Sequence, residues 1–233
     1  MIELSTVIQD IHDTFPDRSV CFATKDVPLD IVLPIGWREF GLNLGNKPTY
    51  PNGWSSFLKE FPSTITLFEN CLLGTVLLLG AHIEMAYVFH DGINFYYYLG
   101  GTPIKEDSVE TVKLKHLPQR LQDFYREVHD GYNFFPARSM GPQRICDQMR
   151  ISELIDDDNN HFAKNWTTVF SNGGGDYVAV DSNSHDAAEG LIWWHEEPAN
   201  PERGIDIFEV MDAWMAIFSE GIQPRERILS TPN

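Results

Sequence analysis

The stretch from residue 170 to residue 220 constrains the fold most strongly, because turn residues, strand alternation and a capped helix follow one another there without conflict. It opens at residues 171–176 with Ser-Asn-Gly-Gly-Gly-Asp, which favours a tight turn since glycine tolerates positive φ and Asn and Asp side chains hydrogen-bond the nearby backbone. Residues 177–181 then alternate as a strand, with odd-numbered side chains on one face and even-numbered ones on the other. Residues 190–195 predict a second strand, and we expect the two strands to pair antiparallel.

A helix is expected directly after these strands. Asp206 occupies an N-cap position, and Glu209 three residues later completes the acidic variant of a capping box. Gly221 supplies a C-terminal stop. Five apolar residues between these signals recur at helical spacing and are expected to share one face: Ile207, Met211, Trp214, Met215 and Phe218.

Five segments follow one another in a recognisable order: 117–125 with the glycine turn His129-Asp130-Gly131, then 150–155, 170–181, 192–196 and 206–208. Over roughly residues 113–222, this order resembles the motif order of the SUKH superfamily. The superfamily contains bacterial toxin-immunity proteins and the related fungal cell-wall assembly regulators. The resemblance implies an α+β fold with helices packed on a mixed or antiparallel central sheet, and a SUKH-like domain over residues 113–225 followed by a short tail at 226–233.

The N-terminal region, residues 1–112, lies outside the resemblance and is expected to be an α+β region built on a three-stranded meander. Apolar spacing predicts a helix over residues 3–15, and residues 55–61 predict a short helix that Pro62 ends. Strands are expected at residues 71–79, 83–89 and 93–99, the last two joined by an Asp-Gly turn. The first of these strands is apolar on both faces, so both faces must be covered.

The boundary between the two regions is placed in residues 100–115, where glycine, proline and a charged run follow the meander. No Ser- or Pro-rich linker occurs there, so the two regions either pack closely or form one compact unit.

Charge restricts the class of partner. The chain has 34 acidic and 17 basic residues, a net charge of −17, which disfavours nucleic acid and anionic membranes. Residues 147–220 hold 16 acidic residues and only three basic ones, Arg150, Lys164 and Arg203, and so account for −13 of the total. Such density indicates either a basic macromolecular partner or a solvated surface that keeps the protein soluble.

The three cysteines, Cys21, Cys71 and Cys146, are widely spaced and form no CxxC pair, which favours a reducing, cytoplasmic location. The first residues carry acid where a signal peptide carries base. The longest apolar run, residues 71–81, is shorter than a membrane span and is interrupted by glycine, so we expect a buried strand.

Catalytic and metal-binding patterns are incomplete. Asp156, Asp158 and Asn160 match the first positions of a calcium loop, but His161 stands at the glycine position and Thr167 at the glutamate position. No HExxH, GxSxG or phosphate-loop pattern occurs, and the glycine run 173–175 predicts only a turn. We therefore expect no catalytic residue, metal or cofactor.

Histidines that stand directly before an acidic residue are the one pattern that favours a metal-dependent hydrolase, and they include His90, His129, His185 and His195. They lie in predicted turns, a loop and a strand end, whereas a metal site needs several ligands that converge on one cavity. Polar turn residues are the expected interpretation.

A partner-binding surface is the remaining expectation. Trp193 and Trp194 must face opposite sides of their strand, and the exposed one beside Glu196 and Glu197 would suit a basic partner. Which tryptophan is exposed is left open by the sequence, and we take Trp194 as the anchor. The full set of expected contacts is Asp156, Asp157, Asp158, Asp176, Glu189, Trp194, Glu196 and Glu197.

The SUKH resemblance implies that this surface belongs to an immunity protein, which neutralises a cognate, basic, nuclease-type toxin domain by covering its active surface. A metal-dependent hydrolase and a regulatory protein-binding scaffold are the alternatives.

Overall fold

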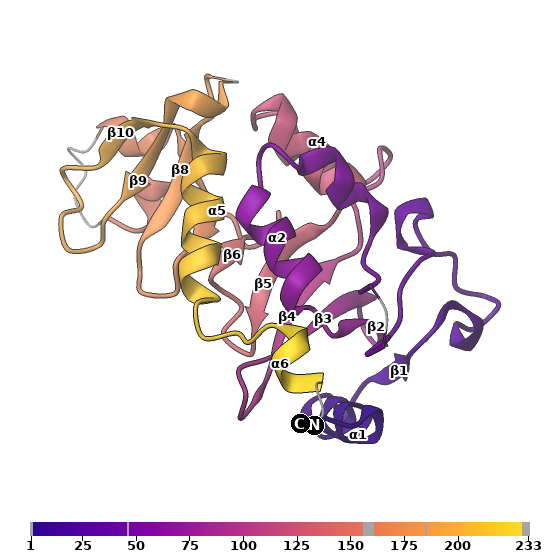
Figure 1. Cartoon of the computed structure of the whole chain (residues 1–233). Helices are drawn as coiled ribbons and strands as arrows, with labels where there is room; N and C mark the ends of the chain where they lie inside the picture. The colour runs from indigo at the N-terminus through magenta and orange to yellow at the C-terminus, as the bar shows by residue number, and fades with distance from the viewer. Residues whose placement is uncertain (1, 46, 156–160, 185, 230–233) are drawn as a thin grey trace.

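The computed structural model describes residues 2–45, 47–155, 161–184 and 186–229, and within them two sheets lie side by side (Figure 1). The first sheet contains β1 (Ser19–Cys21), β2 (Gly74–Leu79), β3 (Glu84–His90), β4 (Phe95–Gly101) and β5 (Asp130–Phe135). The second contains β6 (Gly141–Pro142), β7 (Trp166–Ser171), β8 (Tyr177–Asp181), β9 (Gly190–Trp193) and β10 (Glu202–Ile205). Each sheet is antiparallel, and its strands neighbour one another in chain order.

Helices surround both sheets. The α-helices are α1 (Leu4–Thr14), α2 (Pro62–Cys71), α3 (Thr111–Leu114), α4 (Gln119–Glu127), α5 (Ile207–Phe218) and α6 (Arg225–Leu229). Short 3₁₀ helices are η1 (Thr24–Asp26), η2 (Ile35–Trp37), η3 (Asn52–Phe57), η4 (Ile151–Glu153), η5 (His161–Lys164) and η6 (Ala187–Glu189). The predicted α+β class is confirmed, and the expected three-stranded meander is present as β2, β3 and β4 of the first sheet. No helix in the described part of the chain has the length and apolar character that crossing a bilayer requires.

The first sheet is covered on both faces, as the apolar sequence of β2 predicts. Val7 and Ile11 of α1 and Ile228 of α6 pack on one face, against side chains such as Val76. The other face carries a large core to which η3, α2, α4 and α5 contribute, with aromatic side chains such as Trp54 at its centre.

The segment that leads into β2 differs from the sequence prediction. Pro62 does not end a helix; it is the first residue of α2, and the preceding residues form the 3₁₀ helix η3. Proline suits a first helical position because its missing N–H has no intrahelical partner there. The strand expected from Cys71 starts at Gly74 because Cys71 is still part of α2.

The strand β5 connects the two regions that the sequence separates at residue 112. It follows that boundary, yet it pairs with β4, with Phe134 opposite Tyr98. The glycine turn expected at residues 129–131 is absent: Gly131 has a φ of 76° but lies within β5. The first sheet therefore contains a strand from the C-terminal side of the boundary.

The second sheet confirms the expected β8–β9 pair, in which Tyr177 lies opposite Trp193. Even-numbered residues of β8 pack toward α5, while Ala179 faces a smaller cluster on the outer side, which confirms the predicted alternation. Strands β7 and β10, which flank this pair, were not predicted.

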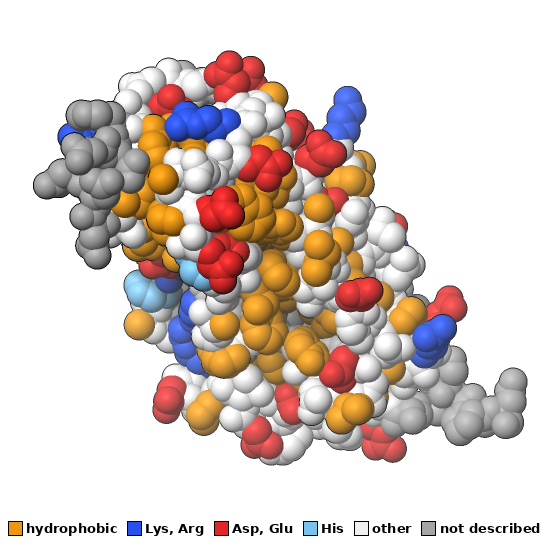
Figure 2. Space-filling model, turned by 90° about the vertical axis from the view of Figure 1, so that its left-hand side faces the viewer, with side chains coloured by type: hydrophobic (Ala, Val, Ile, Leu, Met, Phe, Trp, Pro, Cys, Tyr) orange, Lys and Arg blue, Asp and Glu red, His pale blue; other side chains and the backbone are white. Residues whose placement is uncertain are grey.

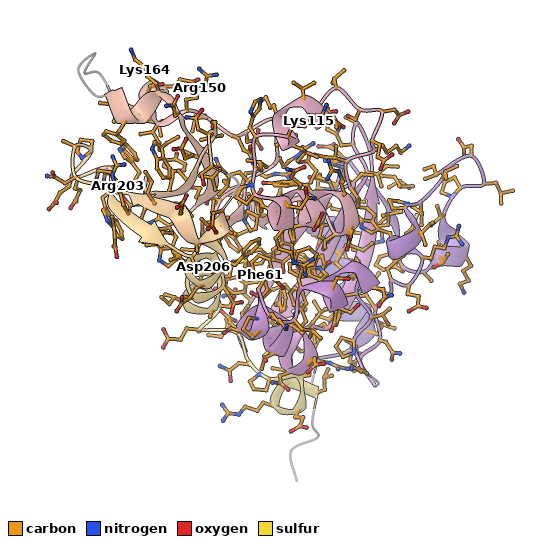
Figure 3. The ribbon with its side chains drawn as sticks, turned by 90° about the horizontal axis from the view of Figure 1, so that it is seen from above. Phe61, Lys115, Arg150, Lys164, Arg203 and Asp206 are labelled. Atoms are coloured by element: carbon orange, nitrogen blue, oxygen red, sulfur yellow. The ribbon has the colours of Figure 1, made fainter. Side chains whose placement is uncertain are left out.

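Helix α5 lies against α2 at the seam between the sheets. Phe61, which precedes α2, and Asp206, which precedes α5, lie on the two sides of this seam (Figure 3). Asp206 caps α5 as predicted, accepting hydrogen bonds from the backbone N–H of Phe208 and Glu209. Asp212, from the middle of α5, accepts hydrogen bonds from the N–H groups of Ser63 and Thr64, both at 2.9 Å, and so caps α2. These bonds fix α5 in position relative to the first sheet.

Candidate functional site

The turn between β7 and β8 is held in one shape by Asn172. Its Oδ1 accepts hydrogen bonds from the backbone N–H of Gly174 at 2.8 Å and of Asp176 at 3.0 Å. Gly175 has a φ of 103°, and a Cβ placed there would lie 3.1 Å from the His195 ring, so glycine is needed for both reasons. The turn thus lies directly beside the segment that follows β9.

Asp176 joins the turn to that segment. One of its carboxylate oxygens accepts a hydrogen bond from the His195 backbone N–H at 3.0 Å and lies 2.7 Å from Nδ1 of the same residue. The other oxygen accepts from the Asn172 side-chain amide at 2.7 Å. Burial alone would raise the pKa of the Asp176 carboxyl, but these hydrogen bonds outweigh it and lower that pKa. Asp176 is therefore held as an anion.

These contacts bring five residues together around a cleft of about 470 Å³: Asp176, Trp194, His195, Glu196 and Glu197. We call it the acidic cleft. Glu196 and Glu197 are exposed, and Asp176 is half-buried. Three carboxylates converging on one opening make it strongly negative and suited to cationic groups.

The two tryptophans at the end of β9 divide as alternation requires. Trp193 is buried, 4% exposed, and its indole N–H donates a hydrogen bond to the Pro198 carbonyl at 3.2 Å. Trp194 is half-exposed in the cleft, and its ring centroid lies 6.1 Å from that of Trp214 on α5. Of the two, Trp194 is thus the one available to a partner.

The structure therefore brings four of the expected contact residues together, Asp176, Trp194, Glu196 and Glu197. Glu189 lies at the other end of β9, about 13 Å of strand away, and accepts a hydrogen bond from the Ser184 hydroxyl at 2.6 Å. Asp156, Asp157 and Asp158 lie outside the described residues. His195 is a cleft residue that sequence reasoning considered only as a metal ligand; its place directly between Trp194 and Glu196 was the available signal.

The histidines of the hydrolase alternative stand in different surroundings. His90 accepts a hydrogen bond from the Gly92 N–H at 2.8 Å, and His129 lies in the first core, whereas His195 faces solvent. His185 lies outside the described residues. Within the described ranges, no group of three or more His, Cys, Asp or Glu side chains is placed to hold a metal ion.

His129 is part of a buried polar network. Its Nε2 lies 2.6 Å from the Tyr87 hydroxyl, which also accepts a hydrogen bond from the Trp54 indole N–H at 2.7 Å. Its Nδ1 lies 3.2 Å from the Gly101 carbonyl, so a neutral ring with a proton on Nδ1 satisfies every group. Burial lowers the pKa of His129 to about 3. This histidine is a neutral structural element of the core.

A second cavity, of about 650 Å³, lies at the seam between α2 and α5. Several of its charged groups are already engaged: Arg120 forms an ion pair with Glu60 at 2.6 Å, and Asp212 caps α2. The cavity is lined by both basic and acidic side chains, in contrast to the acidic cleft.

Comparison of the chain with protein-family models, curated proteins and solved structures found no match. The SUKH resemblance accordingly stays a prediction from the sequence.

Proposed function

We propose that this chain is an immunity protein that binds a basic, nuclease-type bacterial toxin domain through the acidic cleft and blocks the active surface of that domain. A nuclease presents cationic side chains to nucleic acid phosphates. The cleft carboxylates bind those cationic side chains in place of the phosphates. Binding alone is sufficient for this function, and no residue of the chain needs to react.

The observation that carries the proposal is the convergence of Asp176, Glu196 and Glu197 around the half-exposed Trp194. An aromatic anchor rimmed by like charges is the composition of a protein-interface hot spot. The hydrogen bonds to Asp176 support the proposal further, because they fix the charge before a partner arrives and reduce the ordering cost of binding.

Co-expression with the product of the neighbouring reading frame, which the proposal expects to be a toxin domain, tests the proposal. The wild-type chain is expected to rescue growth and to form a stoichiometric complex. The double change Glu196→Lys and Glu197→Lys is expected to lower the association rate constant about tenfold at low salt, because opposite charges steer the encounter.

A matched control reverses another adjacent acidic pair, Glu106 and Asp107, which are exposed in a loop of the first region. This control has the same net charge as the cleft variant and is expected to keep wild-type rescue. Equal rescue and equal low-salt binding by both variants would place the contact surface elsewhere. Stoichiometric metal in the purified protein, with a turnover that His195→Ala abolishes, would replace the proposal with the hydrolase alternative.

A further inference from the structure

Helix α5 carries apolar side chains on the side that faces solvent. Ile207, Phe208, Met211 and Met215 are buried in the core, whereas four other apolar residues keep part of their surface exposed, and we call them the α5 stripe: Val210, Ala213, Trp214 and Ile217. Their spacing of three, one and three places them on one flank of the helix. Val210 and Trp214 also pack against the edge of the core with their buried side. Ala213 is exposed, Val210 and Trp214 are half-exposed, and the Ile217 side chain is 63% exposed.

Helix α4 shows what a surface helix of this protein looks like when its outer side serves only solvent. The exposed and half-exposed positions of α4 are all polar: Gln119, Arg120, Asp123, Arg126 and Glu127. The outer side of α4 is therefore polar, whereas the outer flank of α5 in the same molecule is apolar. An apolar outer flank of this kind indicates a contact surface.

The α5 stripe is continuous with the acidic cleft. Trp214, in the stripe, contacts Trp194, in the cleft, at 6.1 Å between ring centroids. On the opposite border, Glu209 lies four helical positions before Ala213 and is therefore its neighbour, and Glu220 follows two residues after α5 ends at Phe218. Figure 2, which views the side of the second sheet, shows hydrophobic side chains gathered in a band with acidic side chains along it. The stripe is thus apolar with an acidic border on both sides.

The basic residues of this region lie elsewhere. Arg203 stacks over the rings of Phe162 and Trp166 on the face of the second sheet that α5 does not cover. Arg150 and Lys164 also lie away from the seam that Asp206 marks (Figure 3). Lys59 and Arg120 line the seam cavity together with Glu209 and Ala213 of α5, so basic side chains are already present on that flank of the helix. Among the described residues, none of the ion pairs involves Glu196, Glu197 or Glu220, so these bordering acids are open to a cationic partner.

We infer that the α5 stripe docks a basic amphipathic helix of the partner, with the apolar face of that helix on Trp214 and Ile217 and its lysines or arginines on the acidic border. This inference rests on the proposed function and names the element that the partner presents. The stripe covers residues 210–217, about two helical turns, which matches the spacing of anchors in helix-in-groove recognition. A second copy of this chain suits the stripe less, because each copy brings the same acids to the contact and a net charge of −17.

A synthetic helix provides the test. The probe is a fluorescent leucine–lysine peptide of about five turns, with leucine at every position of one face. Its control is a scrambled peptide of equal composition, in which leucine is spread around the helix. Anisotropy at low salt with the full chain is expected to show tighter binding of the amphipathic peptide.

Two variants of the chain locate the contact. Ile217→Ser is expected to weaken binding of the amphipathic peptide about tenfold, as loss of an apolar anchor does. Val112→Ser is the matched control, because Val112 is 64% exposed, also on a helix, but lies in the first region. It is expected to leave binding unchanged.

The outcomes separate this inference from the proposed function. Equal binding of both peptides, or an Ile217→Ser variant that binds as the wild type does, would overturn the docking of a helix on α5 while toxin rescue could still succeed. If Ile217→Ser loses peptide binding and the wild-type chain fails to rescue growth from the toxin, the docking surface is supported and the immunity function is overturned. A wild-type dimer in sedimentation that Ile217→Ser converts to monomer would assign the stripe to a second copy and overturn the basic helix.

Discussion

The two sheets have five strands each and the same antiparallel order, but their faces are covered to different extents. The first is covered on both faces, and its core holds a closed network of Trp54, Tyr87 and His129. The second has α5 on one face and a much smaller cluster on the other. The acidic cleft lies where β8 begins and β9 ends. The first sheet is thus enclosed, whereas the second leaves charged and apolar side chains exposed, and these are the side chains that the proposed function uses.

The largest expected effect separates two tryptophans, one from each region. Trp54 is fully buried among aromatic rings, so Trp54→Ala is expected to lower the free energy of unfolding by about 3–5 kcal/mol. Trp194 is half-exposed, so Trp194→Ala is expected to cost less than about 1 kcal/mol. Urea unfolding of both variants measures the difference. Similar costs would show that the second region contributes as much to stability as the first.

Acid is expected to destabilise the protein through His129. Burial holds the pKa of His129 at about 3 in the folded protein, whereas an unfolded histidine has a pKa near 6.5. Between these values only the unfolded state binds the proton, so the stabilising contribution is complete above pH 6.5 and falls as the pH decreases. The expected slope is about 1.4 kcal/mol per pH unit.

The pH prediction is checked by denaturant unfolding between about pH 6 and pH 4.5. His129→Gln keeps a donor and an acceptor without titrating and should reduce the slope by one proton, whatever its effect on stability at neutral pH. An unchanged slope in that variant would mean that His129 is not the group responsible.

Local signals in the sequence predicted the elements that build the cleft. The turn of residues 171–176, the alternation of β8 and the Asp206 cap each depend on contacts between residues within a few positions of one another. Such contacts are encoded by neighbouring residue types. Trp194, Glu196 and Glu197 follow a strand that was predicted, which is why their common position could be anticipated.

Contacts between distant residues account for what the sequence did not predict. The first turn of α2 is capped by Asp212, far along the chain, so nothing next to Pro62 identifies that residue as a helix start. The sequence after α4 resembles a glycine turn, but pairing with β4 draws Gly131 into a strand. Of the five apolar positions that the sequence assigned to one face of α5, Ile207, Met211 and Met215 are buried, whereas Trp214 and Phe218 pack against the core and stay half-exposed.

The contrast between Asp212 and Asp206 gives a smaller effect within one helix. Asp212 is buried and accepts three hydrogen bonds from Ser63 and Thr64 of α2, so Asp212→Ala is expected to cost about 2 kcal/mol. Asp206 caps only its own exposed helix end, and Asp206→Ala is expected to cost about 1 kcal/mol. Thermal unfolding of the two variants gives the order, and a larger cost for Asp206 would show that the seam between α2 and α5 contributes little.

The smallest expected effect has the opposite sign. Asp176, Glu196 and Glu197 repel one another around the cleft, so replacing both glutamates with glutamine is expected to stabilise the free protein by less than about 0.5 kcal/mol. The gain should fade as salt screens the repulsion. Changing Glu106 and Asp107 to their amides is the control, and it is expected to give a smaller gain because Lys105 precedes them. If the glutamine variant is more stable but binds its partner more weakly, the two glutamates serve recognition at a cost in stability. If the variant is less stable, the same glutamates stabilise the fold.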